Sequence, residues 1–218
     1  MNLVTLPCPG CSCRAGDHPI SSVWDRSGFS LIELVCTLLV LIVLSTLLWS
    51  HSSMSYQRTQ KQLCQDNLQK CYVALKIFAN DHAGTLPYAP DARTSEEVLS
   101  QLVPRCTVDT AIFICPGSKD APLPSGEDFA KRRISYAYYM GSRLTGAPVA
   151  LMSDRQVNTQ ARTPGQLLFS ATGKPPGANH HKFGGNILFT DGSVEFSPAY
   201  SGFALGLTNG VVLLNPKP

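Results

Sequence analysis

One segment limits the possible folds of this chain more than any other. From Phe29 to Trp49 the sequence contains no Pro or Gly and a single formally charged side chain, Glu33. At about 1.5 Å per residue, a helix over 29–49 would span the roughly 30 Å hydrocarbon core of a bilayer. We therefore expect a transmembrane helix here. A carboxylate in such a helix costs about 2.5 kcal/mol or more on insertion scales, so Glu33 needs a partner.

The residues before this segment resemble a known processing site. The sequence Gly-Phe-Ser-Leu-Ile-Glu-Leu at 28–34, followed by apolar residues, is similar to that of type IV pilins and type II secretion pseudopilins. The resemblance implies a leader peptide over 1–28, cleavage after Gly28 and N-methylation of Phe29 by a prepilin peptidase/methyltransferase. It also implies that Glu33 neutralises the new amino terminus of a neighbouring subunit. The alternative is an ordinary signal anchor with Glu33 near the lipid headgroups.

The length and charge of the chain limit its number of domains and the kinds of partner it can bind. Removing 28 residues from 218 leaves 190, enough for the membrane helix and one soluble domain of roughly 140 residues. The net charge of +3 is scattered, so nucleic acid is not an expected partner. Basic residues flank both ends of the apolar segment, so the positive-inside rule does not set its orientation. The expected topology, with the C-terminal domain in the periplasm, rests on the processing motif.

A helical pattern continues beyond the apolar segment. Apolar or cysteine side chains recur at a spacing of three and four from Cys64 to His82, and this one-sided stripe is typical of an amphipathic helix packed on a domain. Gly84 and Pro87 then favour a helix end. The sequence predicts one helix with a transmembrane part over 29–49 and an amphipathic part over 50–83.

The remaining residues, 84–218, predict a globular domain that begins with a long Pro-rich connection. Within it, 94–102 has the pattern of a short helix capped by Thr94 or Ser95, and 111–116 that of a short strand. The C-terminal half is β-rich, with expected strands that end at turn residues. These strand regions are 134–140, 148–152, 167–171, 185–196 and 210–214. The expected fold class is α+β, pilin-like, with the long helix packed on an antiparallel sheet.

The clearest β unit surrounds Asp191-Gly192, a strong signal for a two-residue hairpin turn. Such a turn would pair Phe189 with Val194, and Ile187 with Phe196, on one apolar face. The opposite face would then be mixed in character. A sheet of this kind would cover the amphipathic helix with its apolar side.

The same hairpin carries a second resemblance. His181, nine residues and then Asp191-Gly192 match a His-x9-Asp-Gly signature of prepilin-like proteins from planctomycete- and verrucomicrobia-type bacteria. We expect a structural motif, in which Asp191 and Gly192 form the turn and His181 makes a hydrogen bond that fixes residues 184–185. Because His180 precedes His181, the position of the motif histidine is open by one residue.

Four of the eight cysteines fall in the expected soluble part, namely Cys64, Cys71, Cys106 and Cys115. An oxidising periplasm would allow disulfides among them. Cys64 and Cys71 are seven residues apart on a helix, about 10 Å, which is too far for a bridge. The full pairings left open join the helix to the loop. The alternative is that the two helical cysteines are buried and reduced.

The function expected from these features is assembly, not catalysis. We expect a pseudopilin of a type II secretion-like system in the inner membrane, in contact with lipid and other pseudopilin subunits. By resemblance its partners include an assembly platform and an ATPase. The alternatives are a minor pilin of a surface filament and a membrane-tethered binding module or enzyme with a site of His180, His181, Asp191 and Cys115. No cofactor and no metal site are expected; Ca²⁺ held by Asp154 or Asp191 is an alternative.

Overall fold

The chain has two units in the computed structural model, one ending at Thr46 and one, here called the head unit, from Leu47 to Pro218. The structure describes residues 30–120, 128–144, 146–208 and 210–218, without the side chains of 49–55. The expected leader, the cleavage position Gly28 and its neighbour Phe29 lie outside the described residues. The class is α+β, as expected from the sequence.

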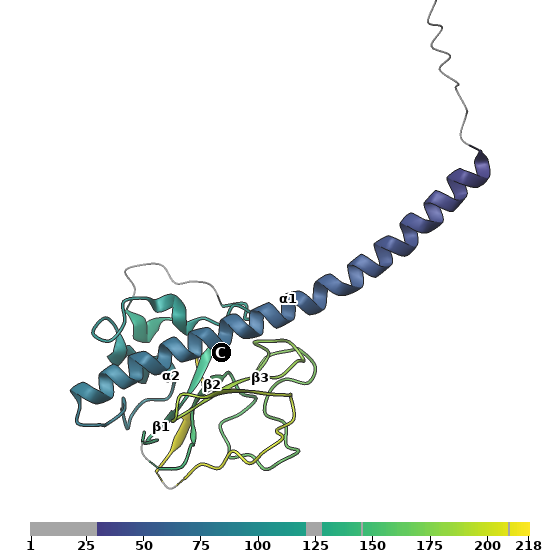
Figure 1. Cartoon of the computed structure of the whole chain (residues 1–218). Coiled ribbons are helices and arrows are strands. Elements are labelled where there is room, and N and C mark those ends of the chain that lie inside the picture. Colours follow the sequence, from purple (N-terminus) through teal and green to yellow (C-terminus); the bar gives the residue numbers. More distant parts are fainter. Residues whose placement is uncertain (1–29, 121–127, 145, 209) are drawn as a thin grey trace, which may run out of the picture. The chain divides into compact units, whose positions relative to one another are not determined.

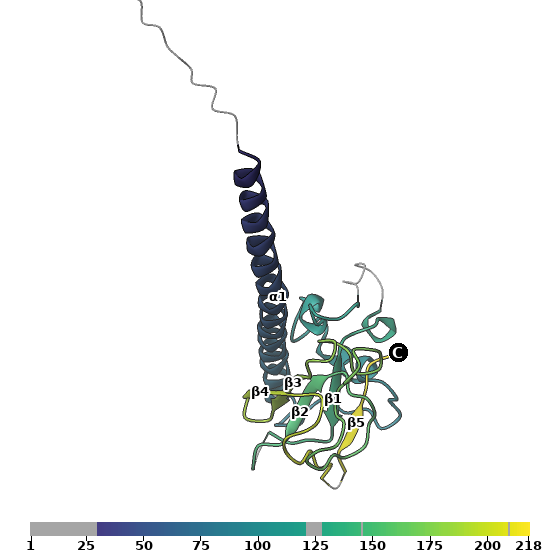
Figure 2. The ribbon, with the colours of Figure 1, turned by 90° about the vertical axis from the view of Figure 1, so that its right-hand side faces the viewer.

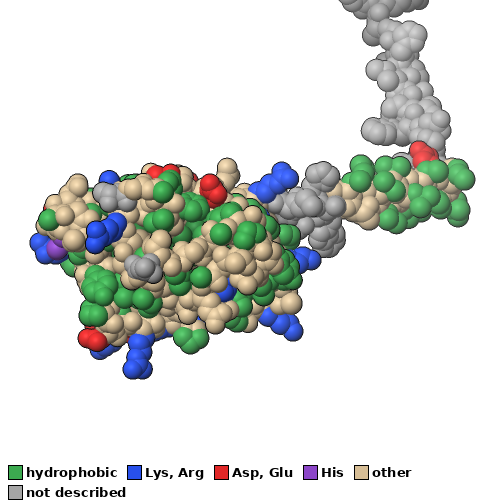
Figure 3. All heavy atoms as spheres, turned by 90° about the horizontal axis from the view of Figure 1, so that it is seen from below, with side chains coloured by type: hydrophobic (Ala, Val, Ile, Leu, Met, Phe, Trp, Pro, Cys, Tyr) green, Lys and Arg blue, Asp and Glu red, His purple; other side chains and the backbone are tan. Residues whose placement is uncertain are grey.

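A single helix, α1 (Leu31–Asp81), contains 51 residues and runs without a break from the apolar segment into the head unit (Figure 1). The side chains from Leu31 to Leu48 are all exposed, and Figure 3 shows hydrophobic side chains along this part. Among the described residues it is the one helix long and apolar enough to cross a membrane. After the helix the backbone is left-handed at Ala83 (φ 53°) and Gly84 (φ 84°), and the N–H of Gly84 donates to Ala79 O over 2.7 Å.

The second half of α1 buries the stripe that its sequence predicts. Cys64, Leu68, Cys71 and Leu75 have no exposed surface, and they belong to one core cluster with side chains of the sheet. Burial of each large apolar side chain stabilises the fold by roughly 1.5–3 kcal/mol. The stripe therefore holds this half of the helix on the sheet.

The sheet has five antiparallel strands in the order β4-β3-β2-β1-β5, which lie side by side in Figure 2. Four of the five predicted strand regions form it, while 167–171 contributes only the isolated bridge between Leu167 and Tyr200. The strands are β1 (Tyr136–Met140), β2 (Ala150–Asp154), β3 (Gly185–Phe189), β4 (Val194–Ser197) and β5 (Val212–Leu214).

Both faces of the central strands are buried, in contrast to the expected mixed outer face. Along β1, Tyr136 and Tyr138 face the core cluster that contains α1, whereas Ala137 and Tyr139 face a second cluster. The second cluster includes Leu168 and other residues of the loops before β3 and after β4. Those loops therefore shield the side of the sheet that faces away from the helix.

The register of the β3–β4 hairpin corrects the prediction by one residue. Leu188, not Phe189, pairs with Val194, and Asn186 pairs with Phe196. Gly192 N donates to Phe189 O, and Phe189 N donates to Ser193 O, so the loop has three residues and places Gly192 in the left-handed region at φ 89°. Asp-Gly suits this longer loop as well as the two-residue turn. The shift turns Leu188 toward α1 and Ile187 toward the second cluster.

The connection between α1 and the sheet contains the expected short helix, α2 (Ser95–Leu99), continued by the 3₁₀ helix η1 (Ser100–Leu102). Thr94 is its N-cap residue but makes no capping hydrogen bond through its side chain. The strand predicted over 111–116 is wrong, because η2 (Thr110–Phe113) is a 3₁₀ helix that starts where Asp109 accepts from Ala111 N over 3.0 Å. A further 3₁₀ helix, η3 (Phe129–Lys131), precedes β1.

Candidate functional site

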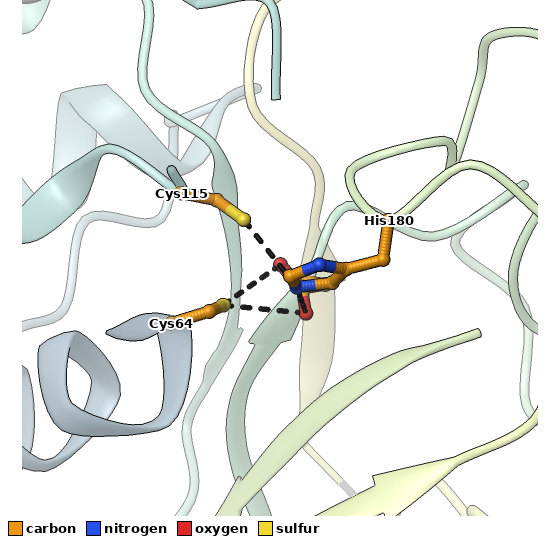
Figure 4. Close-up of side chains that lie close together, drawn as sticks. Cys64, Cys115 and His180 are labelled. Carbon is orange, nitrogen blue, oxygen red and sulfur yellow. Dashed lines mark hydrogen bonds and ion pairs between the residues drawn. The ribbon is translucent and has the colours of Figure 1, made fainter. Parts of the chain in front are cut away.

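Four side chains from four separate segments meet in the interior of the head unit. Cys64 comes from α1, Cys115 follows η2, Asp154 ends β2 and His180 lies in the loop before β3. Each has 0 % exposed surface, and their possible ligand atoms all lie within 4.8 Å of one another. Figure 4 shows the two thiols and the imidazole ring pointing toward a common centre.

The donor atoms of this group are in close contact. Cys64 Sγ lies 3.3 and 3.5 Å from the two carboxylate oxygens of Asp154. His180 Nε2 lies 3.3 Å from Asp154 Oδ2 and 3.4 Å from Cys115 Sγ. We call these four residues the Cys-Asp-His cluster.

Two amide groups hold the carboxylate of Asp154 in place. Asn179 Nδ2 donates to Oδ1 and the backbone N–H of Asn186 donates to Oδ2, each over 2.7 Å. The local backbone requires glycine at 184 and 185. A Cβ on Gly184 would collide with the carbonyl oxygen of Ser197, and a Cβ on Gly185 would lie 2.8 Å from the ring of Phe169. The close approach of this loop to β2 therefore delivers both His180 and the Asn186 amide to Asp154.

Burial and charge set the protonation states of the cluster. Burial raises the pKa of the Cys64 thiol well above its ordinary value and also raises that of Cys115, so both are neutral thiols in the absence of a metal. Burial acts to lower the pKa of His180, but the adjacent Asp154 charge outweighs it and raises this pKa to about 10. Burial likewise opposes ionisation of Asp154, and the His180 charge and hydrogen bonds lower its pKa. The metal-free pair is thus an ion pair.

This arrangement does not fit a catalytic cysteine. A nucleophilic cysteine needs a lowered pKa and access to substrate, whereas Cys115 has a raised pKa and no exposed surface. His180 is equally buried. Among the described residues, the cluster is the one group of three or more His, Cys, Asp or Glu side chains that could hold a metal ion.

The residues of the His-x9-Asp-Gly signature do not meet in the cluster. His181 is exposed in a left-handed backbone conformation (φ 54°), and its ring makes no hydrogen bond within the part of the chain that the structure describes. The hydrogen bond expected from His181 is thus not formed, and it is the preceding residue, His180, that is buried. Asp191 stabilises the turn, since its Oδ1 accepts from Ser193 N over 2.9 Å and from Ser193 Oγ over 2.6 Å.

The four cysteines of the head unit are free thiols in the structure. Cys71 is buried, with its thiol 3.5 Å from Ile112 O, and Cys106 is half-buried. Cys64 and Cys115, one of the helix-to-loop pairs left open by the sequence, do come together, but as members of the Cys-Asp-His cluster. Sulfur and nitrogen neighbours around Asp154 are donors that Ca²⁺ does not favour.

The sequence analysis assigned different roles to the four residues of the cluster. These were disulfide partners for Cys64 and Cys115, a calcium ligand for Asp154 and a catalytic or motif residue for His180. It did not bring them together as one group. One usable signal was an Asp at the end of an apolar strand region together with Asn179-His180 just before a glycine pair. In an antiparallel pair, the end of one strand lies beside the start of the next, so Asp154 at the end of β2 lies beside the loop that leads into β3.

The assembly residue predicted from the sequence, Glu33, lies in the first turn of α1 with an exposed side chain. It has no ion-pair partner among the described residues.

Comparisons of the chain with protein families, with curated proteins and with solved structures find no match.

Proposed function

We propose that this protein is a pseudopilin-like subunit that assembles, through the apolar half of α1, into a filament rooted in the inner membrane. One observation carries the proposal. The helix has a fully exposed apolar half, Leu31–Leu48, that is continuous with a half buried in the head unit. Such a surface needs lipid or other copies of itself as surroundings.

Glu33 gives the assembly a specific register. An exposed carboxylate in the first turn of an apolar helix is costly in lipid or in a bundle of helices unless a cation neutralises it. Cleavage after Gly28 creates a cationic amine at Phe29, about one helical turn from Glu33. Pairing of this amine with Glu33 of a neighbouring subunit neutralises both charges in a low dielectric and fixes how far one helix is displaced along the next.

The head unit stays on the periplasmic side in this proposal. Lipid and filament are both apolar surroundings, so transfer of the segment between them changes the burial of apolar surface little. The resemblance to type II secretion pseudopilins implies that an ATPase and an assembly platform drive this transfer from lipid to filament. The α+β fold, with the second half of the long helix packed on an antiparallel sheet, is consistent with a pilin-like subunit.

Intact mass measurement and N-terminal sequencing of the membrane-extracted protein test the processing step. We expect a chain that begins at Phe29 and carries one additional methyl group. A chain that retains Met1, or that begins at any other residue, would overturn the proposal.

Chemical cross-linking in intact cells tests assembly. We expect ladders of cross-linked copies, alone or with other pseudopilin-like chains, that depend on the apolar segment. A processed protein that remains monomeric at native levels would contradict the filament role. Filaments on sheared cells would instead identify the surface pilus.

A further inference from the structure

We propose that Cys64, Cys115, Asp154 and His180 bind one Zn²⁺ ion in a closed tetrahedral site that fastens α1 to the sheet. This proposal goes beyond the assembly role and is independent of it. It concerns only the head unit, and each of the four ligands comes from a different segment of that unit.

The spacing of the donor atoms supports this assignment. Ligands at about 2.0–2.3 Å from a tetrahedral zinc ion lie roughly 3.3–3.8 Å from one another. The contacts of 3.3 and 3.5 Å between Cys64 Sγ and Asp154, and of 3.4 Å between Cys115 Sγ and His180 Nε2, fall in this range. So does the 3.3 Å distance between His180 Nε2 and Asp154 Oδ2. For the Nε2–Oδ2 pair, 3.3 Å exceeds the usual N–H···O distance of about 2.7–3.2 Å.

The donor set also selects the metal. Two sulfur atoms with one imidazole nitrogen and one carboxylate oxygen suit Zn²⁺, whereas Ca²⁺ and Mg²⁺ require mostly oxygen ligands. Four protein ligands without exposed surface leave no open coordination position. The site is therefore structural and not catalytic.

Hydrogen bonds from outside the cluster orient two of the four ligands, Asp154 and Cys64. The carboxylate of Asp154 is oriented by the amides of Asn179 and Asn186 over 2.7 Å each. The hydroxyl of Tyr136 donates to Cys64 Sγ over 3.4 Å. Such outer donors orient the ligands and offset part of the negative charge that two thiolates and a carboxylate bring to one ion.

The Nε2 atom of His180 points at the other donor atoms of the cluster, as a metal ligand would. Its Nε2 faces the Asp154 carboxylate at 3.3 Å and the side-chain amide of Asn186 at 3.4 Å. A single nitrogen cannot both donate to the carboxylate and accept from the amide, but it can direct its lone pair at a cation. The other nitrogen, Nδ1, has no partner among the described residues and lies against Gly117, where a Cβ would be 2.8 Å away.

A surface pocket of about 340 Å³ lies beside the site. Its lining includes Gly117, which lies two residues after Cys115, and Asn179, which directly precedes His180. Once bound, the ion joins α1, the η2 loop, β2 and the β3 loop at one point.

Metal analysis of the full-length protein, purified in detergent under reducing conditions and equilibrated with Zn²⁺, tests the site. We expect one tightly held zinc per chain by native mass spectrometry. Cys115→Ser and His180→Ala should lower zinc affinity at least tenfold. The matched controls Cys106→Ser and His181→Ala, which change residues of the same type outside the cluster, should retain it.

A second measurement keeps the test independent of variant folding. Co²⁺ bound to the unmodified chain should give the visible bands of tetrahedral cobalt and a charge-transfer band from thiolate. A wild-type chain that stays metal-free, octahedral cobalt without thiolate ligation, or a Cys64–Cys115 disulfide in the protein isolated from cells would each overturn the proposal. Zinc bound equally well by His180→Ala and His181→Ala would also overturn it. None of these results depends on whether the subunit forms filaments.

Discussion

Two carboxylates in this protein, Glu33 and Asp154, lie in contrasting surroundings, since Glu33 is exposed on the apolar half of α1 and Asp154 is buried in the head unit. Asp154 is fully buried and receives hydrogen bonds from Asn179 and Asn186 and an ion-pair contact from His180. Glu33 belongs to an apolar helix surface and has no ion pair within the described part of its own chain. The first charge is satisfied by folding, and we propose that a second copy of the chain satisfies the other.

The difference separates stability from assembly. Changes at Asp154 should act on the folded state of the head unit, because its partners are internal. Changes at Glu33 should leave the fold intact and act on contacts between copies. Four substitutions, taken from the largest expected effect to the smallest, test this separation.

Glu33→Ala should have the largest effect, with filament-associated protein reduced to background and no change in membrane insertion or in unfolding of the head unit. The carboxylate that would neutralise a neighbouring amine is gone, while the apolar segment is unchanged. The amounts in sedimented filaments and in carbonate-washed membranes measure the two effects. Thr37→Ala, one turn along α1, is the control, because Thr37 Oγ1 donates only to Leu34 O of its own helix. Normal incorporation of the Glu33 variant would contradict the proposed pairing.

Asp154→Ala should lower the free energy of unfolding of the head unit by about 3–5 kcal/mol, since it leaves buried donors and the His180 charge without a partner. Denaturant unfolding of the detergent-solubilised chain is the measurement. Asp66→Ala, at an exposed position of α1, should change the same quantity by less than about 0.5 kcal/mol. Equal losses in the two variants would show that the buried network contributes nothing of its own.

Leu75→Ala removes a fully buried side chain of α1 and should lower the free energy of unfolding by about 2–5 kcal/mol. Leu39→Ala makes the same chemical change in the apolar segment, where Leu39 is 58 % exposed. It should leave unfolding of the head unit unchanged. A comparable loss in both would mean that the two halves of the helix are stabilised in the same way.

Gly192→Ala should give the smallest effect, about 1–2 kcal/mol, because the left-handed backbone at φ 89° disfavours any Cβ. The added Cβ would also lie 2.7 Å from the ring of Tyr72 on α1. Gly84→Ala has the same backbone cost at φ 84° but meets nothing within 4 Å. Thermal unfolding of the two variants should show the greater loss for Gly192→Ala, and the reverse order would exclude a close contact between the hairpin and the helix.

Features that depend on neighbours in sequence were predictable. The long helix was expected from its apolar length and from the stripe Cys64–His82, and α1 ends within two residues of that expectation. Most strands were expected from β-branched and aromatic runs between turn residues. The hairpin register was not, because Asp191-Gly192 suits both a two-residue and a three-residue loop. The strand expected over 111–116 failed since an Asp109 hydrogen bond starts a 3₁₀ turn instead.

The Cys-Asp-His cluster could not be assembled from the sequence. Its members follow no local spacing rule, and each residue type has a commoner explanation at its own position. The packing of α1 on the sheet brings Cys64 to Asp154. The close approach of Gly184 to Ser197, and of Gly185 to Phe169 and Asp154, brings His180 to both residues. Long-range convergence of this kind is a property of tertiary structure.

The distances along the chain between cluster members have a further consequence. Cys64 and Asp154 are 90 residues apart, and Cys115 and His180 are 65 apart. Contacts of such separation form only after large loops have closed, which slows their formation. The two sulfur atoms consequently remain open to alkylating reagents until the head unit is complete and become inaccessible afterwards. The rate at which these thiols lose their reactivity therefore reports how fast the head unit completes its fold.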